Sequence, residues 1–270
     1  MTHQNRLIVI TGGAGGIGMA CARAFKGEEL VITDYSQEIV DKALDTLKKE
    51  GFNASGIACD ITNKKDVENL KNYVAERGSL GALIHTAGVS GTVQDLKKVY
   101  TIDLVGTEIL IDAFYKIAID DSVAVLFSSM MAHAVPANAK YDNALENPSA
   151  SGSFETVSQF VGGSSDNMYN FAKRGVQLLS IKHADAWGAK GARIVTISPG
   201  VIETPMGLKA AEEHPERMEL IKKATPLGRY GSPQDVVGVV KFLVSDAARF
   251  ITATDILVDG GVIHNIKNMG

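Results

Sequence analysis

The chain has 270 residues, of which 45% are hydrophobic and 21% charged, with a formal net charge of −4. This length fits one large α/β domain or two smaller ones, and the acidic balance argues against nucleic acid as the main partner. No apolar run approaches the roughly 20 residues that cross a bilayer. The first residues lack a signal-peptide cleavage site, and the spacing of Cys21 and Cys59 fits neither a metal site nor a disulfide framework. We therefore expect a cytoplasmic protein without a metal site, a membrane partner or a nucleic-acid partner.

Short apolar, β-branched runs alternate with longer amphipathic segments along most of the chain. Strands that are apolar throughout are typical of parallel sheets covered on both faces. The alternation predicts an α/β fold over residues 1–270, a single-domain Rossmann-type doubly wound parallel sheet flanked by helices. The expected strands are RLIVITG, LVITD, NASGIACD, ALIHTAG, VAVLFSS, ARIVTISPG and TDILVDGG, and the expected helices cover residues 17–25, 38–50, 64–77, 95–116 and 169–187.

Two segments interrupt this alternation, residues 132–168 and residues 201–224. Long connections in compact α/β domains are usually functional lids or disordered segments, and we assign both as insertions or lids of the same domain. The second segment carries Met206, Leu208 and Met218 among charged residues, as expected for a mobile flap with an apolar underside. The alternative is that these side chains only pack the flap onto the body of the protein.

The segment TGGAGGIG, residues 11–18, follows the first strand and opens a helix. Glycines there let backbone N–H groups approach a pyrophosphate at the positive end of a helix. A tight turn between strand and helix also favours glycine, but the repeated βα units support the phosphate-binding interpretation. We assign this loop to coenzyme binding through Thr11, Gly12, Gly16, Ile17 and Gly18.

Asp34 ends the second strand, 22 residues beyond Gly12. An acidic residue at about this distance accepts hydrogen bonds from the adenosine ribose hydroxyls, beside Tyr35. The alternative is an N-cap for the following helix. The glycine loop, Tyr35 and Ser36 offer no Lys or Arg for a 2′-phosphate, so we predict NAD (NADH) as coenzyme.

The third and fourth strands end in further candidate coenzyme contacts. Asp60 and Ile61 are placed to meet the adenine edge, although Asp60 is also a good N-cap for the helix near residue 64. Ala87 and Gly88 leave room for a ribose against the backbone, and the alternative there is a plain strand-ending glycine.

Several motifs in order resemble the short-chain dehydrogenase/reductases nearly end to end. They are TGxxxGxG from Thr11, AG at 87–88, SS at 128–129, YxxxK at 169–173, PGVIETP at 199–205 and DGG at 259–261. The long gap between serine and tyrosine, with AWGAKGARI and SPGVIETPM, is most similar to the 3α-hydroxysteroid dehydrogenase/carbonyl reductase branch.

Tyr169 and Lys173 are four residues apart, so on a helix they share one face, as many unrelated surface pairs do. The resemblance implies that Tyr169 is the general acid–base and that Lys173 lowers its pKa and binds the nicotinamide ribose. It implies that Ser129, rather than Ser128, polarises the carbonyl of the substrate. The implied contacts to the nicotinamide end of the coenzyme are Pro199, Gly200, Ile202 and Thr204, the last two at the carboxamide.

Asp103, in TIDLVG, stands where relatives usually carry an asparagine that supports a water beside the lysine. An ionised Asp accepts hydrogen bonds but cannot donate them. It could bind the same water, raise the pKa of the lysine, or be a tolerated substitution. A second departure is His85, which we interpret as a buried strand residue.

The resemblance implies an NAD-dependent enzyme that interconverts a secondary alcohol and a ketone by hydride transfer. No Lys or Arg stands beside Ser129 to bind an acid or a phosphate, so we expect an apolar alcohol or ketone, a hydroxysteroid or bile acid. The alternatives are an aryl-alcohol dehydrogenase of the coniferyl type, a general carbonyl reductase, or a non-catalytic NAD-sensing protein. Relatives assemble through helices, so a homodimer or homotetramer is expected.

Overall fold

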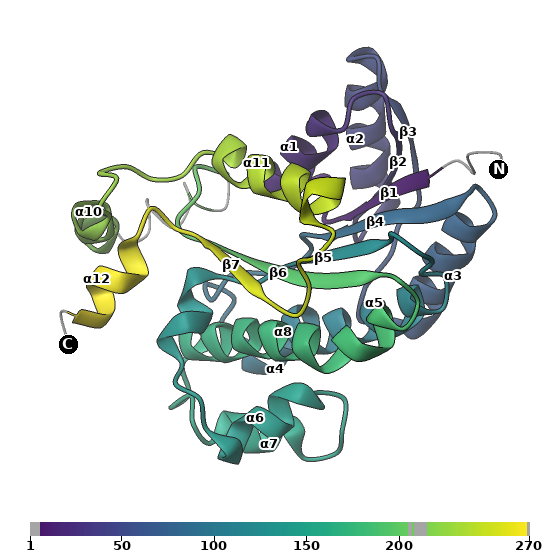
Figure 1. Ribbon diagram of the computed structural model, residues 1–270. Helices are drawn as coiled ribbons and strands as arrows, with labels where there is room; N and C mark the ends of the chain where they lie inside the picture. Colours follow the sequence, from purple (N-terminus) through teal and green to yellow (C-terminus); the bar gives the residue numbers. More distant parts are fainter. Residues whose placement is uncertain (1–5, 205–206, 208–214, 269–270) are drawn as a thin grey trace.

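The computed structural model describes residues 6–204, 207 and 215–268. These residues form one seven-stranded sheet with the order β3-β2-β1-β4-β5-β6-β7, in which every neighbouring pair is parallel (Figure 1). The strand order reverses beside β1, the kind of switch point at which such sheets bind ligands. The strands are β1 Arg6–Thr11, β2 Glu29–Thr33, β3 Asn53–Gly56, β4 Ser79–His85, β5 Val123–Phe127, β6 Arg193–Pro199 and β7 Asp255–Val258.

Helices cover both faces of the sheet, as the predicted doubly wound fold requires (Figure 1). One apolar core joins the sheet to α1, α2 and α11, and a second core joins it to α3, α4, α5 and α8. The helices are α1 Gly16–Ala24, α2 Gln37–Lys49, α3 Lys64–Ala75, α4 Leu96–Tyr100, α5 Gly106–Tyr115, α6 Ala139–Glu146, α7 Ser153–Ser158, α8 Ser165–Gly188, α10 Pro215–Ala224, α11 Pro233–Val244 and α12 Val262–Asn268, with short helical segments at Thr101–Val105, Met130–Ala134 and Asp246–Ala248.

The central strands β5 and β6 are buried along their whole length. This explains why VAVLF and RIVTISP lack the apolar–polar alternation of a half-exposed strand. In the described part of the chain, no helix has both the length and the apolarity needed to cross a membrane.

Three element boundaries differ from the sequence-based expectation. The predicted helix at 95–116 is divided into α4, a π-helical turn at Thr101–Val105 and α5. Helix α8 begins four residues before Tyr169, because the Ser164 side chain accepts a hydrogen bond from the Asn167 N–H and caps it. The third strand ends at Gly56, so Asp60 follows it by four residues.

Residues 132–168 contain α6 and α7, which pack on the side of α8 that faces away from the sheet (Figure 1). The Arg174 guanidinium donates to both carboxylate oxygens of Asp142, at 2.8 and 2.7 Å. The rings of Tyr141 and Phe171 meet edge to face, with centroids 4.8 Å apart. These contacts fasten the segment to the helix that carries Tyr169 and Lys173.

Candidate functional site

The glycine loop between β1 and α1 is packed too closely for side chains. A Cβ on Gly18 would lie 2.2 Å from the Gly12 carbonyl oxygen. Gly12 has a φ of +63°, and a Cβ there would lie 2.7 Å from the Ala87 backbone. The N-cap residue of α1 is Gly15, which has no side chain that could cap the first N–H groups of the helix. The loop therefore brings backbone N–H groups to the end of the sheet, the arrangement that binds a pyrophosphate.

Asp34 follows β2 and faces this loop. Its carboxylate accepts hydrogen bonds from the backbone N–H groups of Ala14, at 3.2 Å, and Tyr35, at 2.9 Å. The capping alternative is wrong, because Ser36 is the N-cap of α2.

Asp60 lies beyond the end of β3. Its Oδ1 accepts from the backbone N–H and the hydroxyl of Thr62, while Asn63 is the N-cap of α3. The capping alternative for Asp60 is therefore wrong as well.

Gly88 lies where three parts of the candidate site meet. A Cβ at this position would lie 2.6 Å from Asp103 Oδ1 and 3.2 Å from Lys173 Nζ. A larger residue would displace one of these two groups, so the glycine is required by close approach and not only by a strand end.

The serine pair after β5 lies against α8. The Ser128 Oγ donates to the Lys173 carbonyl at 2.9 Å, which anchors α8 to the strand. The Ser129 Oγ accepts from the Met131 N–H at 3.2 Å and begins the turn Met130–Ala134. Both serines line the cavity described below, and Ser129 is the one that begins this turn.

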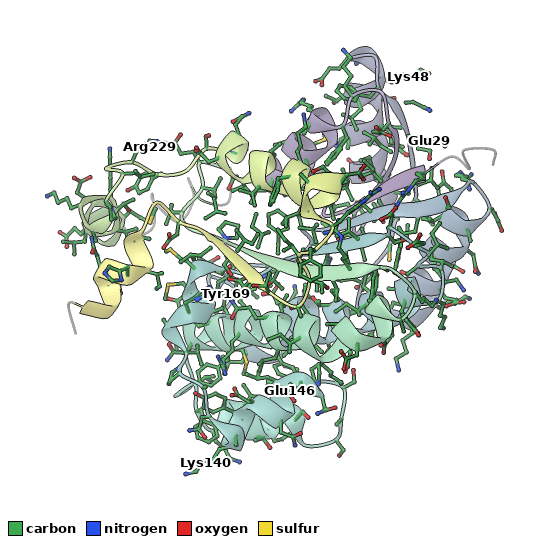
Figure 2. The ribbon with its side chains drawn as sticks, viewed as in Figure 1. Glu29, Lys48, Lys140, Glu146, Tyr169 and Arg229 are labelled. Atoms are coloured by element: carbon green, nitrogen blue, oxygen red, sulfur yellow. The ribbon has the colours of Figure 1, made fainter. Side chains whose placement is uncertain are left out.

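Tyr169 and Lys173 lie in the first half of α8. Figure 2 shows Tyr169 near the carboxyl ends of the strands. The Lys173 side chain is buried, and its Nζ donates to the Phe127 carbonyl at 3.2 Å. The same Nζ lies 5.6 Å from the centre of the Tyr169 ring. The cation is thus held close to the phenol, which is half-buried.

Asp103 is buried within the π-helical turn and lies 3.8 Å from Lys173 Nζ, measured from Oδ1. The same oxygen accepts from the Val89 N–H at 2.8 Å, whereas Oδ2 has no hydrogen-bond partner among the described residues. Burial raises the pKa of Asp103, and the Lys173 charge and the Val89 N–H partly offset this rise.

His85 is buried on β4, as expected, between the hydroxyls of Thr11 at 2.7 Å and Thr107 at 2.9 Å. Because the Thr107 hydroxyl donates to the Asp103 carbonyl, it accepts from His85 Nε2, and Thr11 donates to Nδ1. Burial, and secondarily the Lys173 charge, lowers the pKa of His85 to about 3. The imidazole is therefore neutral at physiological pH and connects the glycine loop to the Asp103 turn.

The segment after β6 borders the site on its other side. A Cβ on Gly200 would lie 2.8 Å from the Asp259 Cα, and Ile202 forms a bridge with Gly231. Thr204 is buried, and its Oγ1 accepts from the Gly207 N–H at 3.1 Å. Met206 and Leu208 of the predicted flap lie outside the described residues.

One cavity of about 960 Å³ joins these parts. Every residue that we predicted for coenzyme binding or catalysis lines it, with the single exception of Asp103, which lies behind Gly88 and Lys173. The predicted lining residues are Thr11, Gly12, Gly16, Ile17, Gly18, Asp34, Tyr35, Asp60, Ile61, Ala87, Gly88, Ser129, Tyr169, Lys173, Pro199, Gly200, Ile202 and Thr204.

Met218 of the predicted flap comes from α10 and lines the cavity, as its place on the apolar underside implies. Other parts of the cavity wall were not predicted from the sequence. Met130 and Met131 follow Ser129, and Ile221 comes from α10. A polar group consists of Ser90, Thr92, Asp166 and Asn170. Asp166 lies three residues before Tyr169 on α8 and so shares its face, which was the available signal. Asn170 directly follows Tyr169, and nothing local in the sequence marks Ser90 or Thr92.

Comparisons with known proteins identify the family of this chain. A family model described as enoyl-(acyl carrier protein) reductase matches residues 12–263. The chain belongs to the short-chain dehydrogenase/reductase family.

Two curated relatives are similar over nearly the whole chain. The 7alpha-hydroxysteroid dehydrogenase of Bacteroides fragilis is 30% identical, over 97% of this chain and 96% of the relative. The meso-2,3-butanediol dehydrogenase of Serratia marcescens is 32% identical, over the same shares of the two chains. The crystal structure of gox2181 has a TM-score of 0.79 and 28% identity, covering 96% of this chain and 95% of the other.

Proposed function

We propose that the protein is an NAD-dependent oxidoreductase that interconverts a secondary alcohol and a ketone. The observation that carries this proposal is that Ser129, Tyr169 and Lys173 line the same cavity as the glycine loop. The cradle at Gly12 and Gly18, which a Cβ would fill, fits a dinucleotide pyrophosphate. The bound nicotinamide would supply the hydride donor or acceptor.

In this proposal Tyr169 transfers the proton to or from the substrate oxygen, and Ser129 holds that oxygen by a hydrogen bond. The Lys173 Nζ, 5.6 Å from the centre of the Tyr169 ring, would stabilise the negative charge that develops on the phenol oxygen during the transfer. Thr204 and the backbone near Ile202 would hold the carboxamide. The walls of the cavity would exclude water from the reacting atoms.

We predict that NADH binds at least about tenfold more tightly than NADPH, a difference of about 1.4 kcal/mol. A 2′-phosphate would meet the Asp34 carboxylate, and no ion pair joins Asp34 to a Lys or Arg among the described residues. Fluorescence titration with both coenzymes tests this prediction. Asp34→Asn should reduce the preference, whereas the matched variant Asp60→Asn should retain it. Equal affinity for the two coenzymes in the unmodified protein would refute the assignment.

We expect Asp103→Asn to keep activity and to change the dependence of stability on pH. The raised pKa means that the folded state binds a proton more tightly than the unfolded chain. The stability that this proton confers is complete below the ordinary Asp pKa of about 4 and is lost as pH rises through the folded pKa. Urea unfolding of both proteins across this range should show the parent losing stability relative to the variant. Parallel pH profiles would contradict the prediction.

We propose a hydroxysteroid or bile acid as the substrate. Met130, Met131, Met218 and Ile221 give the cavity an apolar wall that suits a large ring system. The similarity to a 7alpha-hydroxysteroid dehydrogenase supports the same class. A vicinal diol or polyol is the second candidate, because Ser90, Thr92, Asp166 and Asn170 offer hydrogen-bond partners.

A substrate panel followed at the nicotinamide absorbance band tests this proposal. The panel contains hydroxysteroids, bile acids, their oxo forms, aryl alcohols, small diols and polyols. The highest kcat/KM should fall in the steroid group. Turnover confined to diols and polyols would overturn the steroid assignment but not the reaction. Tight NADH binding without any turnover would instead favour a coenzyme-sensing protein.

We also propose a homodimer or homotetramer. Phe250 is fully exposed, and Phe242 and Leu257 are partly exposed, on or between α11 and the edge strand β7. Apolar side chains at a sheet edge are typical of a surface that a second subunit covers. The outer face of α8 is already covered by α6 and α7, which favours the dimer. Light scattering at micromolar concentration should give at least twice the mass of one chain, and a monomer would contradict the proposal.

A further inference from the structure

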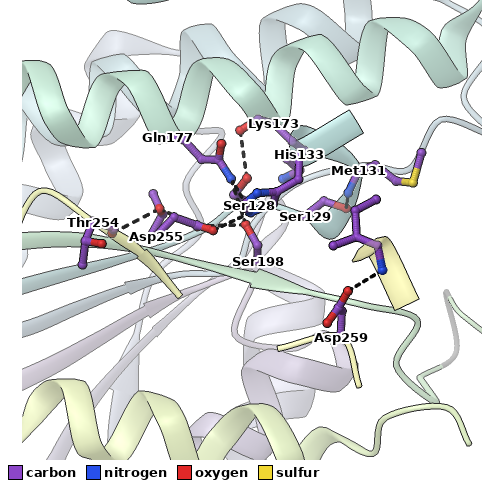
Figure 3. A network of polar contacts seen from close by, with 12 residues as sticks. Ser128, Ser129, Met131, His133, Lys173, Gln177, Ser198, Thr254, Asp255 and Asp259 are labelled. Atoms are coloured by element: carbon purple, nitrogen blue, oxygen red, sulfur yellow. Dashed lines mark hydrogen bonds and ion pairs between the residues drawn. The ribbon is translucent and has the colours of Figure 1, made fainter. Parts of the chain in front are cut away.

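A partly buried polar cluster lies behind the turn Met130–Ala134 that follows Ser129, called the serine turn below, between α8 and the strands β6 and β7 (Figure 3). The Asp255 Oδ1 accepts from the hydroxyls of Thr196, at 2.6 Å, and Ser198, at 2.8 Å. Its Oδ2 lies 2.7 Å from His133 Nε2. Gln177, one turn after Lys173 on α8, donates to the Ser198 Oγ at 3.0 Å. The cluster thus connects the serine turn to α8, which carries Lys173, and to the strands β6 and β7.

His133 is the group of this cluster that belongs to the serine turn. It lies four residues after Ser129, in the turn Met130–Ala134. His133 Nε2 lies 2.7 Å from the Asp255 Oδ2 and 3.2 Å from the Gln177 amide nitrogen. The carboxylate oxygen is the acceptor of the shorter contact, so Nε2 carries the hydrogen and donates it to Asp255, while the Gln177 amide donates to Ser198. His133 does not line the cavity formed by the described residues. Direct contact with substrate is therefore not its role.

The strand β7 also holds the other side of the nicotinamide end. The Gly200 N–H donates to the Val258 carbonyl at 2.9 Å, three residues after Asp255. One short strand is therefore the common support for the serine turn and for the segment that begins at Gly200. A charged hydrogen bond of 2.7 Å at a mostly buried carboxylate is a stiff connection.

We propose that His133 and Asp255 are positioning residues. They hold the Ser129 hydroxyl at a fixed place relative to the segment that begins at Gly200, which we predict to contact the nicotinamide. This rests on the proposed function, because it requires that Ser129 binds the substrate oxygen. A displacement of the turn costs rate because the reaction depends on sub-ångström placement of the groups that stabilise the transition state.

The test is a double-mutant cycle on turnover. His133→Leu should lower kcat about tenfold, while the dissociation constant of NADH, measured by fluorescence, stays unchanged because the glycine loop and Lys173 are untouched. His133→Gln should restore most of kcat, since its amide reaches Asp255 with a neutral donor. His133→Asn, which is polar but too short, should behave like His133→Leu and serves if the leucine variant does not fold.

The decisive comparison repeats His133→Leu in a Ser129→Ala background. If His133 acts through Ser129, the second substitution should cost no further kcat. The same tenfold loss in both backgrounds would overturn the positioning role and leave the proposed function intact. If Ser129→Ala alone leaves kcat unchanged, the role of Ser129 in the proposed function fails and the positioning role fails with it. Failure of His133→Gln to recover kcat would also count against the positioning role.

Discussion

Tyr169→Phe is expected to lower kcat by about 10² or more, a loss of at least about 2.7 kcal/mol in transition-state stabilisation. The substitution removes the transferable proton and leaves the ring, so the packing of α8 is preserved. NADH affinity should be largely unchanged, because the glycine loop, Asp34 and Lys173 are untouched. Turnover kinetics with a coenzyme titration measures both quantities.

A matched control for Tyr169→Phe is Tyr141→Phe. Tyr141 lies in the segment packed on α8, and its hydroxyl donates to the Pro136 carbonyl outside the cavity. This variant should retain kcat. Near-normal turnover by the Tyr169 variant would remove Tyr169 from the proton transfer.

Lys173→Met is expected to impair turnover, coenzyme affinity and stability together. The amine is assigned to both the phenolate and the nicotinamide ribose, so kcat and NADH affinity should both fall. The buried Asp103 carboxyl would lose the Lys173 cation beside it, and breaking a buried pair typically costs about 3–5 kcal/mol. Urea unfolding and turnover kinetics on the same preparations measure these effects.

The double variant Lys173→Met with Asp103→Asn separates the two roles of the lysine. Removing the uncompensated carboxylate should recover part of the lost stability, because a neutral amide is less costly to bury. It should recover none of the lost turnover, because the cation beside Tyr169 is still absent. A full recovery of turnover would show that Lys173 matters only for folding.

Much of the coenzyme site could be predicted from the sequence because its parts are local. Within residues 6–24, the composition and order of the residues are enough to predict a strand, a glycine-rich turn and a helix. Asp34 was placed at the same cavity in the same way, by its distance from Gly12 at the end of a strand, and its contact with a ribose stays a prediction. The assignment of roles to Ser129, Tyr169 and Lys173 came from family resemblance and stays a prediction.

The surroundings of Asp103 could not be predicted in the same way. The periodicity of residues 95–116 indicates one continuous helix, and this periodicity does not predict a π-helical turn. That turn packs against α8, and Asp103 there meets Gly88 and Lys173, which are distant from it in the chain. The helices at 139–146 and 153–158 were missed because each is short and is stabilised mainly by contact with α8.

The sequence by itself determined the parallel α/β architecture, since short and mostly apolar strands separated by amphipathic helices can bury their surfaces in few other ways. It also determined the position of the glycine loop. Only the tertiary structure decided which polar residues meet. His133 and Asp255 are 122 positions apart, and Lys173 and Asp103 are 70 apart. Their pairing depends on how distant elements such as α8 and β7 pack in the fold. Local secondary-structure propensity does not predict such long-range contacts.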